Sequence, residues 1–206
     1  MSRGRRNTLF VFAALVVFVF ACFDRNAVSY KRRHQYSARQ STASDVEKYH
    51  AKIFTVVNVV DGDTIDINIP DGKYDHTRIR LWGVDTPETK KPNTPIMYFG
   101  PEASEFTKET VLDKTVTIYL DEKQTRDNKK YDRLLAYVQL ENGKFLNEEL
   151  LREGFAYADL RFKHDFYNRY KQLEAAARRG KKGLWEKVTP EQMPEWKRKN
   201  REVVSG

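Results

Sequence analysis

Short segments of alternating apolar and polar residues, separated by Asp-Gly pairs, most narrowly limit the fold of this chain. Isoleucine alternates with polar residues from Ile65 to Ile69, which is the period of a strand with one buried face. Asp61-Gly62 precedes this segment and Asp71-Gly72 follows it, and Asp-Gly is a common two-residue hairpin turn. The sequence therefore predicts consecutive antiparallel strands that begin near residue 52.

Helical patterns come mostly after the strands. Two more strands are expected in the apolar segments 115–120 and 134–140. Three stretches have the spacing and end signals of helices, such as a proline at the start or a glycine after the end: 101–111, 147–152 and 166–177. This order predicts an α+β, mainly β fold, namely a five-stranded OB-fold barrel with about three packed helices.

The two ends differ in composition from this body, which we place at residues 51–186. Residues 1–29 are expected to be a signal peptide or membrane anchor, because a basic start precedes the uncharged apolar run 9–23. Cleavage near Ser29, lipidation of Cys22 and retention as an anchor all stay open. The polar, Ser-rich stretch 30–50 is typical of a flexible linker, and 187–206 of a loose charged tail.

Composition and missing motifs exclude several classes of function. The formal net charge of +8 suits a polyanionic partner, although a solvated basic surface explains the charge equally well. The single cysteine, Cys22, rules out an internal disulfide, and the scattered histidines make a structural zinc site improbable. The sequence also contains no P-loop, GxSxG or GxGxxG motif.

Carboxylates stand at strand ends in two short segments, 61–64 (DGDT) and 80–89 (RLWGVDTPET). Side chains at neighbouring strand ends can converge on one hard cation, and calcium accepts such oxygen ligands in a flexible shell. Phosphodiester cleavage needs such a cation and benefits from guanidinium groups, for which Arg80 and Arg133 are candidates. Glu88 could position or deprotonate the attacking water. Each segment alone would be read as a turn, so the prediction depends on their combination.

Taken together, these segments resemble the staphylococcal nuclease (thermonuclease) family. The resemblance covers about residues 52–185 and rests on several motifs in one order: 61–64, 80–89, 98–104, 131–137, Asn147-Glu148, Gly154 and 183–185. It implies an OB-fold barrel and a calcium-dependent nuclease that hydrolyses DNA and RNA. The cofactor that it implies is Ca2+.

The resemblance also implies a role for six residues of this chain. Asp63 and Asp85 would hold calcium through their carboxylates, and Thr86 through its backbone carbonyl. Glu88 would be the general base, and Arg80 and Arg133 would bind the scissile phosphate. All six positions hold the residue types of the family. A non-catalytic nucleic-acid- or protein-binding module on the same fold is the alternative, but such a module would be free to lose them.

Two departures from the family concern substrate binding. Asp132 stands before the second arginine where the family often has glycine, and Leu160 and Phe162 stand where the family has tyrosines. Phe162 could still stack on a base, and Tyr131 keeps an aromatic ring near the site, although a half-buried barrel tyrosine explains it equally well. Lys90 and Lys91 could follow a phosphate backbone.

The expected location follows from the N-terminus and from the chemistry. A nuclease of broad range would damage its own cell, and calcium is plentiful outside cells. We therefore expect a monomer that is secreted or held in the cell envelope, with DNA and RNA as substrates. Any contact with a membrane would run through residues 9–23.

Overall fold

The computed structural model describes residues 42–90, 95–121, 123–127 and 131–202. The chain divides into two units, Met1–Ser44 and Asp45–Gly206, and the elements below belong to the second. The expected signal peptide or anchor and the first part of the linker lie outside the described residues. Within the described ranges, no helix is long and apolar enough to cross a membrane.

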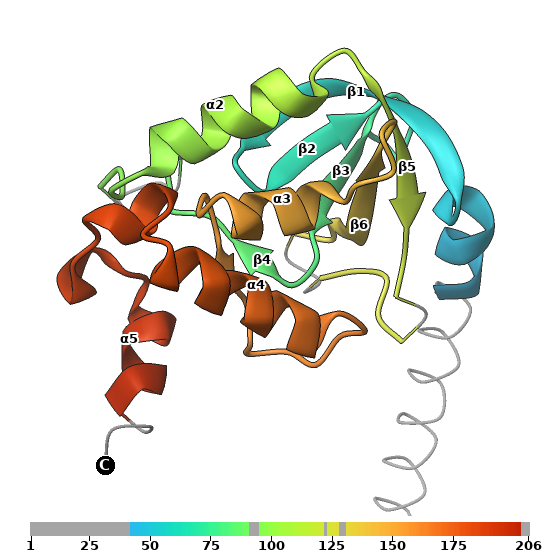
Figure 1. Cartoon of the computed structure of the whole chain (residues 1–206). Helices are drawn as coiled ribbons and strands as arrows, with labels where there is room; N and C mark the ends of the chain where they lie inside the picture. Colours follow the sequence, from blue (N-terminus) through green and yellow to red (C-terminus); the bar gives the residue numbers. More distant parts are fainter. Residues whose placement is uncertain (1–41, 91–94, 122, 128–130, 203–206) are drawn as a thin grey trace, which may run out of the picture. The chain divides into compact units, whose positions relative to one another are not determined.

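Five strands close a barrel in the order β1-β2-β3-β6-β5 (Figure 1). Their bounds are β1 Lys52–Asp61, β2 Thr64–Ile67, β3 Thr77–Leu81, β5 Thr115–Tyr119 and β6 Leu134–Leu140. Neighbouring strands are antiparallel except β3 and β6, which run parallel. The predicted five-stranded, mainly β barrel is therefore confirmed.

Strand β2 is buried on both faces, whereas its alternating sequence predicts one exposed face. The difference comes from Asp66, which points away from the isoleucines and is nevertheless covered. Arg78 on the neighbouring strand β3 reaches it with Nε 2.8 Å from Oδ1, and Asn58 on β1 donates to Oδ2 at 2.9 Å. A buried carboxylate is stable only with such partners, so this pairing accounts for the covered polar face.

Helices α2 (Gly100–Val111), α3 (Leu146–Arg152) and α4 (Tyr167–Arg179) form where helical patterns predict them. Helix α3 packs on β6 and contacts both α2 and α4. A short two-stranded sheet joins β4 (Val84–Asp85) to β7 (Tyr157–Ala158) in antiparallel pairing. This sheet ties the segment after β3 to the start of the C-terminal helices.

The folded body begins earlier than the sequence suggests. Residues 45–49 are helical, so they are not part of a flexible linker, which was expected over 30–50. Tyr49 is fully buried, and its hydroxyl lies 3.0 Å from Oγ1 of Thr77. Asp45 accepts a bond of 2.7 Å from Nη2 of Arg126. An aromatic ring and a paired carboxylate thus join this segment to the barrel.

The body also continues beyond residue 186. After the 3-10 helix η1 (Gly183–Glu186), the chain forms a second one, η2 (Pro190–Gln192), and helix α5 (Glu195–Glu202). We expected a loose tail here because the segment is highly charged. The difference arises because Met193 is buried in a second apolar cluster with Tyr157, Ala177, Leu184 and Trp185, against which Trp196 packs.

Candidate active site

The first predicted carboxylate is built into the turn between β1 and β2. Asp63 is 1% exposed, and its Oδ2 accepts bonds from the backbone N of Thr86 at 2.8 Å and from its Oγ1 at 3.2 Å. The Thr86 side chain also explains why position 62 is a glycine. A Cβ at this position would lie only 2.8 Å from the Thr86 side chain. The turn therefore packs closely against the Thr86 side chain in the segment after β4.

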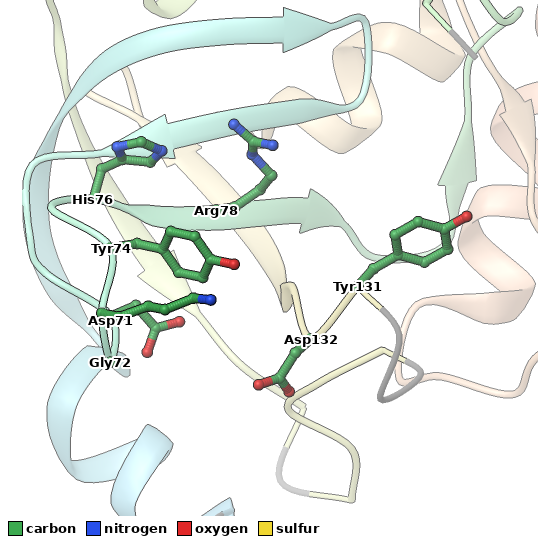
Figure 2. A pocket seen from close by; sticks show the side chains of 8 residues that line it. Asp71, Gly72, Tyr74, His76, Arg78, Tyr131 and Asp132 are labelled. Atoms are coloured by element: carbon green, nitrogen blue, oxygen red, sulfur yellow. The ribbon is translucent and has the colours of Figure 1, made fainter. Parts of the chain in front are cut away.

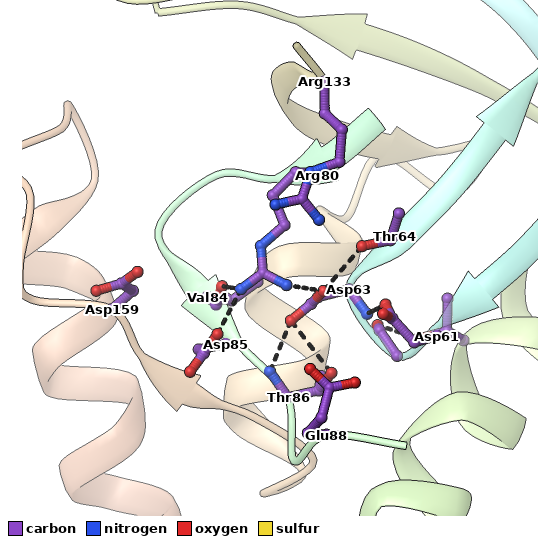
Figure 3. A network of polar contacts seen from close by, with 12 residues as sticks. Asp61, Asp63, Thr64, Arg80, Val84, Asp85, Thr86, Glu88, Arg133 and Asp159 are labelled. Atoms are coloured by element: carbon purple, nitrogen blue, oxygen red, sulfur yellow. Dashed lines mark hydrogen bonds and ion pairs between the residues drawn. The ribbon is translucent and has the colours of Figure 1, made fainter. Parts of the chain in front are cut away.

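Arg80 joins the two predicted metal-binding aspartates. Its Nη1 contacts Oδ1 of Asp63, and its Nη2 lies 2.5 Å from Oδ1 of Asp85 and 3.2 Å from the carbonyl of Val84 (Figure 3). Arg80 is the penultimate residue of β3 and Asp85 ends β4, so the ends of these two strands bring the groups together. The planar guanidinium suits this bridging of two carboxylates.

Burial dominates the electrostatics of this cluster. The pKa of Asp63 is raised to about 7, chiefly by burial and also by nearby Asp61, although Arg80 and the Thr86 N–H favour the ionised form. Burial also raises the pKa of Asp85. Two desolvated carboxylates share one guanidinium here, so an additional positive charge would stabilise their ionised forms.

The donor set of this cluster fits a hard divalent cation. Asp63 and Asp85 both contact one guanidinium, so both carboxylates lie within reach of a single ion, and their oxygens are the ligands that calcium prefers. No group of three or more His, Cys, Asp or Glu side chains gathers as metal ligands among the described residues. The predicted set has only two carboxylates and relies on the Thr86 carbonyl and on water for the rest.

Glu88 lies in the loop after β4, and Figure 3 shows it beside Thr86. Its Oε1 accepts bonds of 3.0 Å from the backbone N atoms of Thr89 and Lys90. These bonds fix the orientation of the carboxylate. An ionised carboxylate can accept a proton, which is the capacity that the predicted general base requires.

Arg133 stands just before β6, the parallel neighbour of β3, which carries Arg80. Its Nε lies 2.8 Å from Oδ2 of Asp127, and its guanidinium lies over the ring of Tyr131 with 5.2 Å between the charged carbon and the ring centre. The structure thus brings Asp63, Arg80, Asp85 and Thr86 into direct contact, whereas Arg133 is held by a separate ion pair.

Asp132 has a left-handed backbone with φ of 49°. Glycine adopts this conformation without steric cost, which explains the preference for glycine that the family resemblance implies at this position. The Asp132 side chain lines a groove of about 670 Å³, with Tyr131 beside it and the β2–β3 connection opposite (Figure 2). The other lining residues are Asp71, Gly72, Lys73, Tyr74, His76 and Arg78.

We expect Asp132→Gly to raise the free energy of unfolding by up to about 1 kcal/mol, because it removes the steric cost of the left-handed conformation. Denaturant unfolding would measure the change. Asp132→Ala is the matched control, since it also removes the carboxylate but keeps a Cβ. Equal stability of the two variants would show that the backbone conformation costs nothing here.

The predicted substrate-binding residues are spread around this cluster. Tyr131 is 55% exposed and Phe162 is 50% exposed. The Phe162 ring stacks on Trp82 with 5.9 Å between the ring centres. Both rings therefore present a face or an edge to solvent. Lys90 is exposed, and Lys91 lies outside the described residues.

Two further residues contact the site and were not predicted from the sequence. Trp196 donates from Nε1 to Oδ2 of Asp85 at 2.8 Å, and Nη2 of Arg161 lies 3.8 Å from Oδ1 of the same carboxylate. Trp196 is 111 positions away from Asp85 in a charged segment, so no local pattern indicates the contact. A large apolar ring among charged neighbours was the one sequence feature that could have indicated a buried contact for Trp196.

The barrel and the carboxylate–arginine cluster at its strand ends define an OB-fold protein similar to staphylococcal nuclease. Comparison with known sequences agrees, because the profile of the family described as "Staphylococcal nuclease homologue" matches residues 78–187. The chain belongs to this family, as the sequence motifs predict.

Curated relatives include proteins from two bacteria and one archaeon. A protein named thermonuclease from Staphylococcus hyicus is 43% identical over 64% of this chain and 75% of its own length. Endonuclease YncB from Bacillus subtilis is 38% identical over 65% of this chain and 61% of its own. An uncharacterized protein from Methanocaldococcus jannaschii is 31% identical over 90% of this chain and 98% of its own.

Proposed function

We propose that this protein is a calcium-dependent nuclease that hydrolyses phosphodiester bonds in DNA and RNA. The observation that carries the proposal is the contact of one partly buried guanidinium, Arg80, with two carboxylates, the buried Asp63 and the partly buried Asp85. Family membership and the names of the thermonuclease and endonuclease relatives support the same activity.

Each residue of the site has a chemical task in this proposal. Asp63, Asp85 and the Thr86 carbonyl would hold the calcium ion, which offsets negative charge on the phosphate when bound. Arg80 and Arg133 bind the phosphoryl oxygens, and they bind most strongly when charge on those oxygens grows in the transition state. Glu88 orients the attacking water and accepts its proton as the new P–O bond forms. The ester oxygen leaves and takes up a proton from solvent.

Substrate contacts outside this cluster would come from the exposed aromatic rings. Tyr131 stands two positions before Arg133 and lies under its guanidinium. Phe162 projects beside Arg161, with 5.8 Å between its ring centre and the charged carbon. Bases can stack on such rings without sequence preference. Lys90 and Lys91 would add charge along the phosphate backbone.

The metal requirement is the sharpest test of the proposed function. Calcium should support cleavage of labelled DNA and RNA, and excess chelator should abolish this cleavage. Metals that prefer soft or imidazole ligands should replace calcium poorly, because all the proposed ligands are oxygens. Asp85→Asn should lose the response to calcium. Full cleavage in excess chelator would contradict the calcium assignment, and binding of nucleic acid without cleavage would instead select the non-catalytic module.

We also propose that the protein acts as a monomer outside the cytoplasmic membrane, released after cleavage near Ser29 or held there by residues 1–29. The apolar run 9–23 and the expected need for calcium support this location. Cell fractionation and sequencing of the mature N-terminus would test it. Intact Met1 on a soluble cytoplasmic protein would refute export, and a lipid on Cys22 would select the anchored form.

A further inference from the structure

The C-terminal helix delivers a tryptophan to one of the proposed metal ligands. Trp196, in the first turn of α5, donates from Nε1 to Oδ2 of Asp85 at 2.8 Å. The other carboxylate oxygen, Oδ1, lies 2.5 Å from Nη2 of Arg80. Asp85 is therefore held from both sides: Arg80 of the barrel contacts one oxygen, and Trp196 of the C-terminal segment contacts the other.

Helix α5 is anchored by its own buried contacts. Lys197 is buried beside Trp196, and its Nζ lies 2.6 Å from Oε1 and 2.7 Å from Oε2 of Glu174 on α4. Met193, just before α5, is 4% exposed within the second apolar cluster. A buried ion pair and a buried apolar side chain on either side of Trp196 fix its position relative to α4.

The Trp196 ring makes a second contact at the site. The guanidinium of Arg161 lies over it, with 4.4 Å between the charged carbon and the ring centre. Asp159 holds the same guanidinium with Oδ2 2.7 Å from Nη2. The indole therefore has two separable functions, because its ring supports Arg161 and its N–H binds Asp85.

We propose that Trp196 is a positioning residue for Asp85, so that residues 190–202 complete the active site. The inference rests on the proposed function, because it assigns Asp85 to metal binding. By occupying Oδ2, the indole N–H fixes the carboxylate rotamer and leaves Oδ1 facing Arg80 and the proposed cation site. Partners that orient a ligand in this way typically contribute tenfold to a hundredfold to metal affinity.

Trp196→Phe separates the two functions of the indole. Phenylalanine keeps an aromatic ring under Arg161 and removes only the N–H donor. Trp185→Phe is the matched control, because Arg178 lies over the Trp185 ring at 4.8 Å. Among the described residues, the Trp185 indole nitrogen has no hydrogen-bond partner. A loss of calcium affinity that occurs in Trp196→Phe and not in Trp185→Phe therefore reports the bond to Asp85.

Calcium binding to the full chain, measured by titration calorimetry, is the primary readout. We expect the dissociation constant to rise about tenfold or more in Trp196→Phe and to change less than about twofold in Trp185→Phe. Equal affinity of wild type and Trp196→Phe overturns the inference while the proposed function stands. A wild-type chain that neither binds calcium nor cleaves DNA refutes the proposed function itself, and the inference with it.

A second readout uses the wild-type protein and does not depend on the folding of Trp196→Phe. The chain has three tryptophans, so its proton–nitrogen NMR spectrum should show three indole signals. Calcium should shift the Trp196 signal, because Trp196 contacts a proposed ligand, and leave the Trp185 signal nearly unchanged, because its indole nitrogen has no partner in the described part of the chain. A Trp196 signal that does not respond at saturating calcium contradicts the proposal.

Discussion

Replacing Arg80 by lysine should slow phosphodiester cleavage by about a hundredfold or more. The guanidinium bridges Asp63 and Asp85 from two different nitrogens. In the proposed mechanism it also binds the phosphate as charge develops. Lysine keeps the positive charge but offers a single nitrogen, so it cannot hold both carboxylates and a phosphoryl oxygen in one plane. Single-turnover cleavage rates in saturating calcium would measure the loss.

Arg78→Lys is the control for this experiment, because Arg78 lies two residues earlier on the same strand. It pairs with Asp66 through two nitrogens, at 2.8 Å and 3.0 Å, outside the carboxylate cluster. Arg78→Lys should lower the stability of the fold slightly and leave the cleavage rate near that of wild type. Similar rate losses in both variants would indicate a general effect on the barrel and would contradict a specific role for Arg80.

The barrel could be predicted because its signals are local. Alternation and Asp-Gly turns specify strands, and proline and glycine mark where helices begin and end. The ends of the domain could not be predicted in this way. Tyr49 and Lys197 stand in polar, charged segments, and their burial depends on partners far away in sequence, namely Thr77 and Glu174. Long-range pairs of this kind leave no periodic signal.

The same division applies to the candidate site. Asp63, Arg80, Asp85 and Thr86 are spaced so that adjacent strand ends bring them together, and the structure places them in contact. The environment of Arg133 was not predictable, because Asp127 competes for its guanidinium. The role of Trp196 was also hidden, since its contact with Asp85 depends on how α5 docks on α4.

Replacing Glu88 by glutamine should slow cleavage by about a hundredfold to ten-thousandfold, which is the usual contribution of a general base. Glutamine is the informative change because of the local contacts. Oε1 of Glu88 accepts bonds from the backbone N atoms of Thr89 and Lys90, and an amide oxygen can accept both. The loop should therefore keep its shape while the side chain loses its capacity to accept a proton from water.

The discriminating measurement compares cleavage with binding in the same Glu88→Gln preparation. Binding of labelled DNA in chelator, followed by fluorescence anisotropy, should stay within about threefold of wild type, because the change touches no proposed phosphate ligand. Glu105→Gln, on the exposed face of α2, removes a carboxylate far from the carboxylate–arginine cluster in sequence and should change neither quantity. If Glu88→Gln lost binding and rate together, Glu88 would have a role in metal binding or folding. A normal rate would exclude Glu88 as the base.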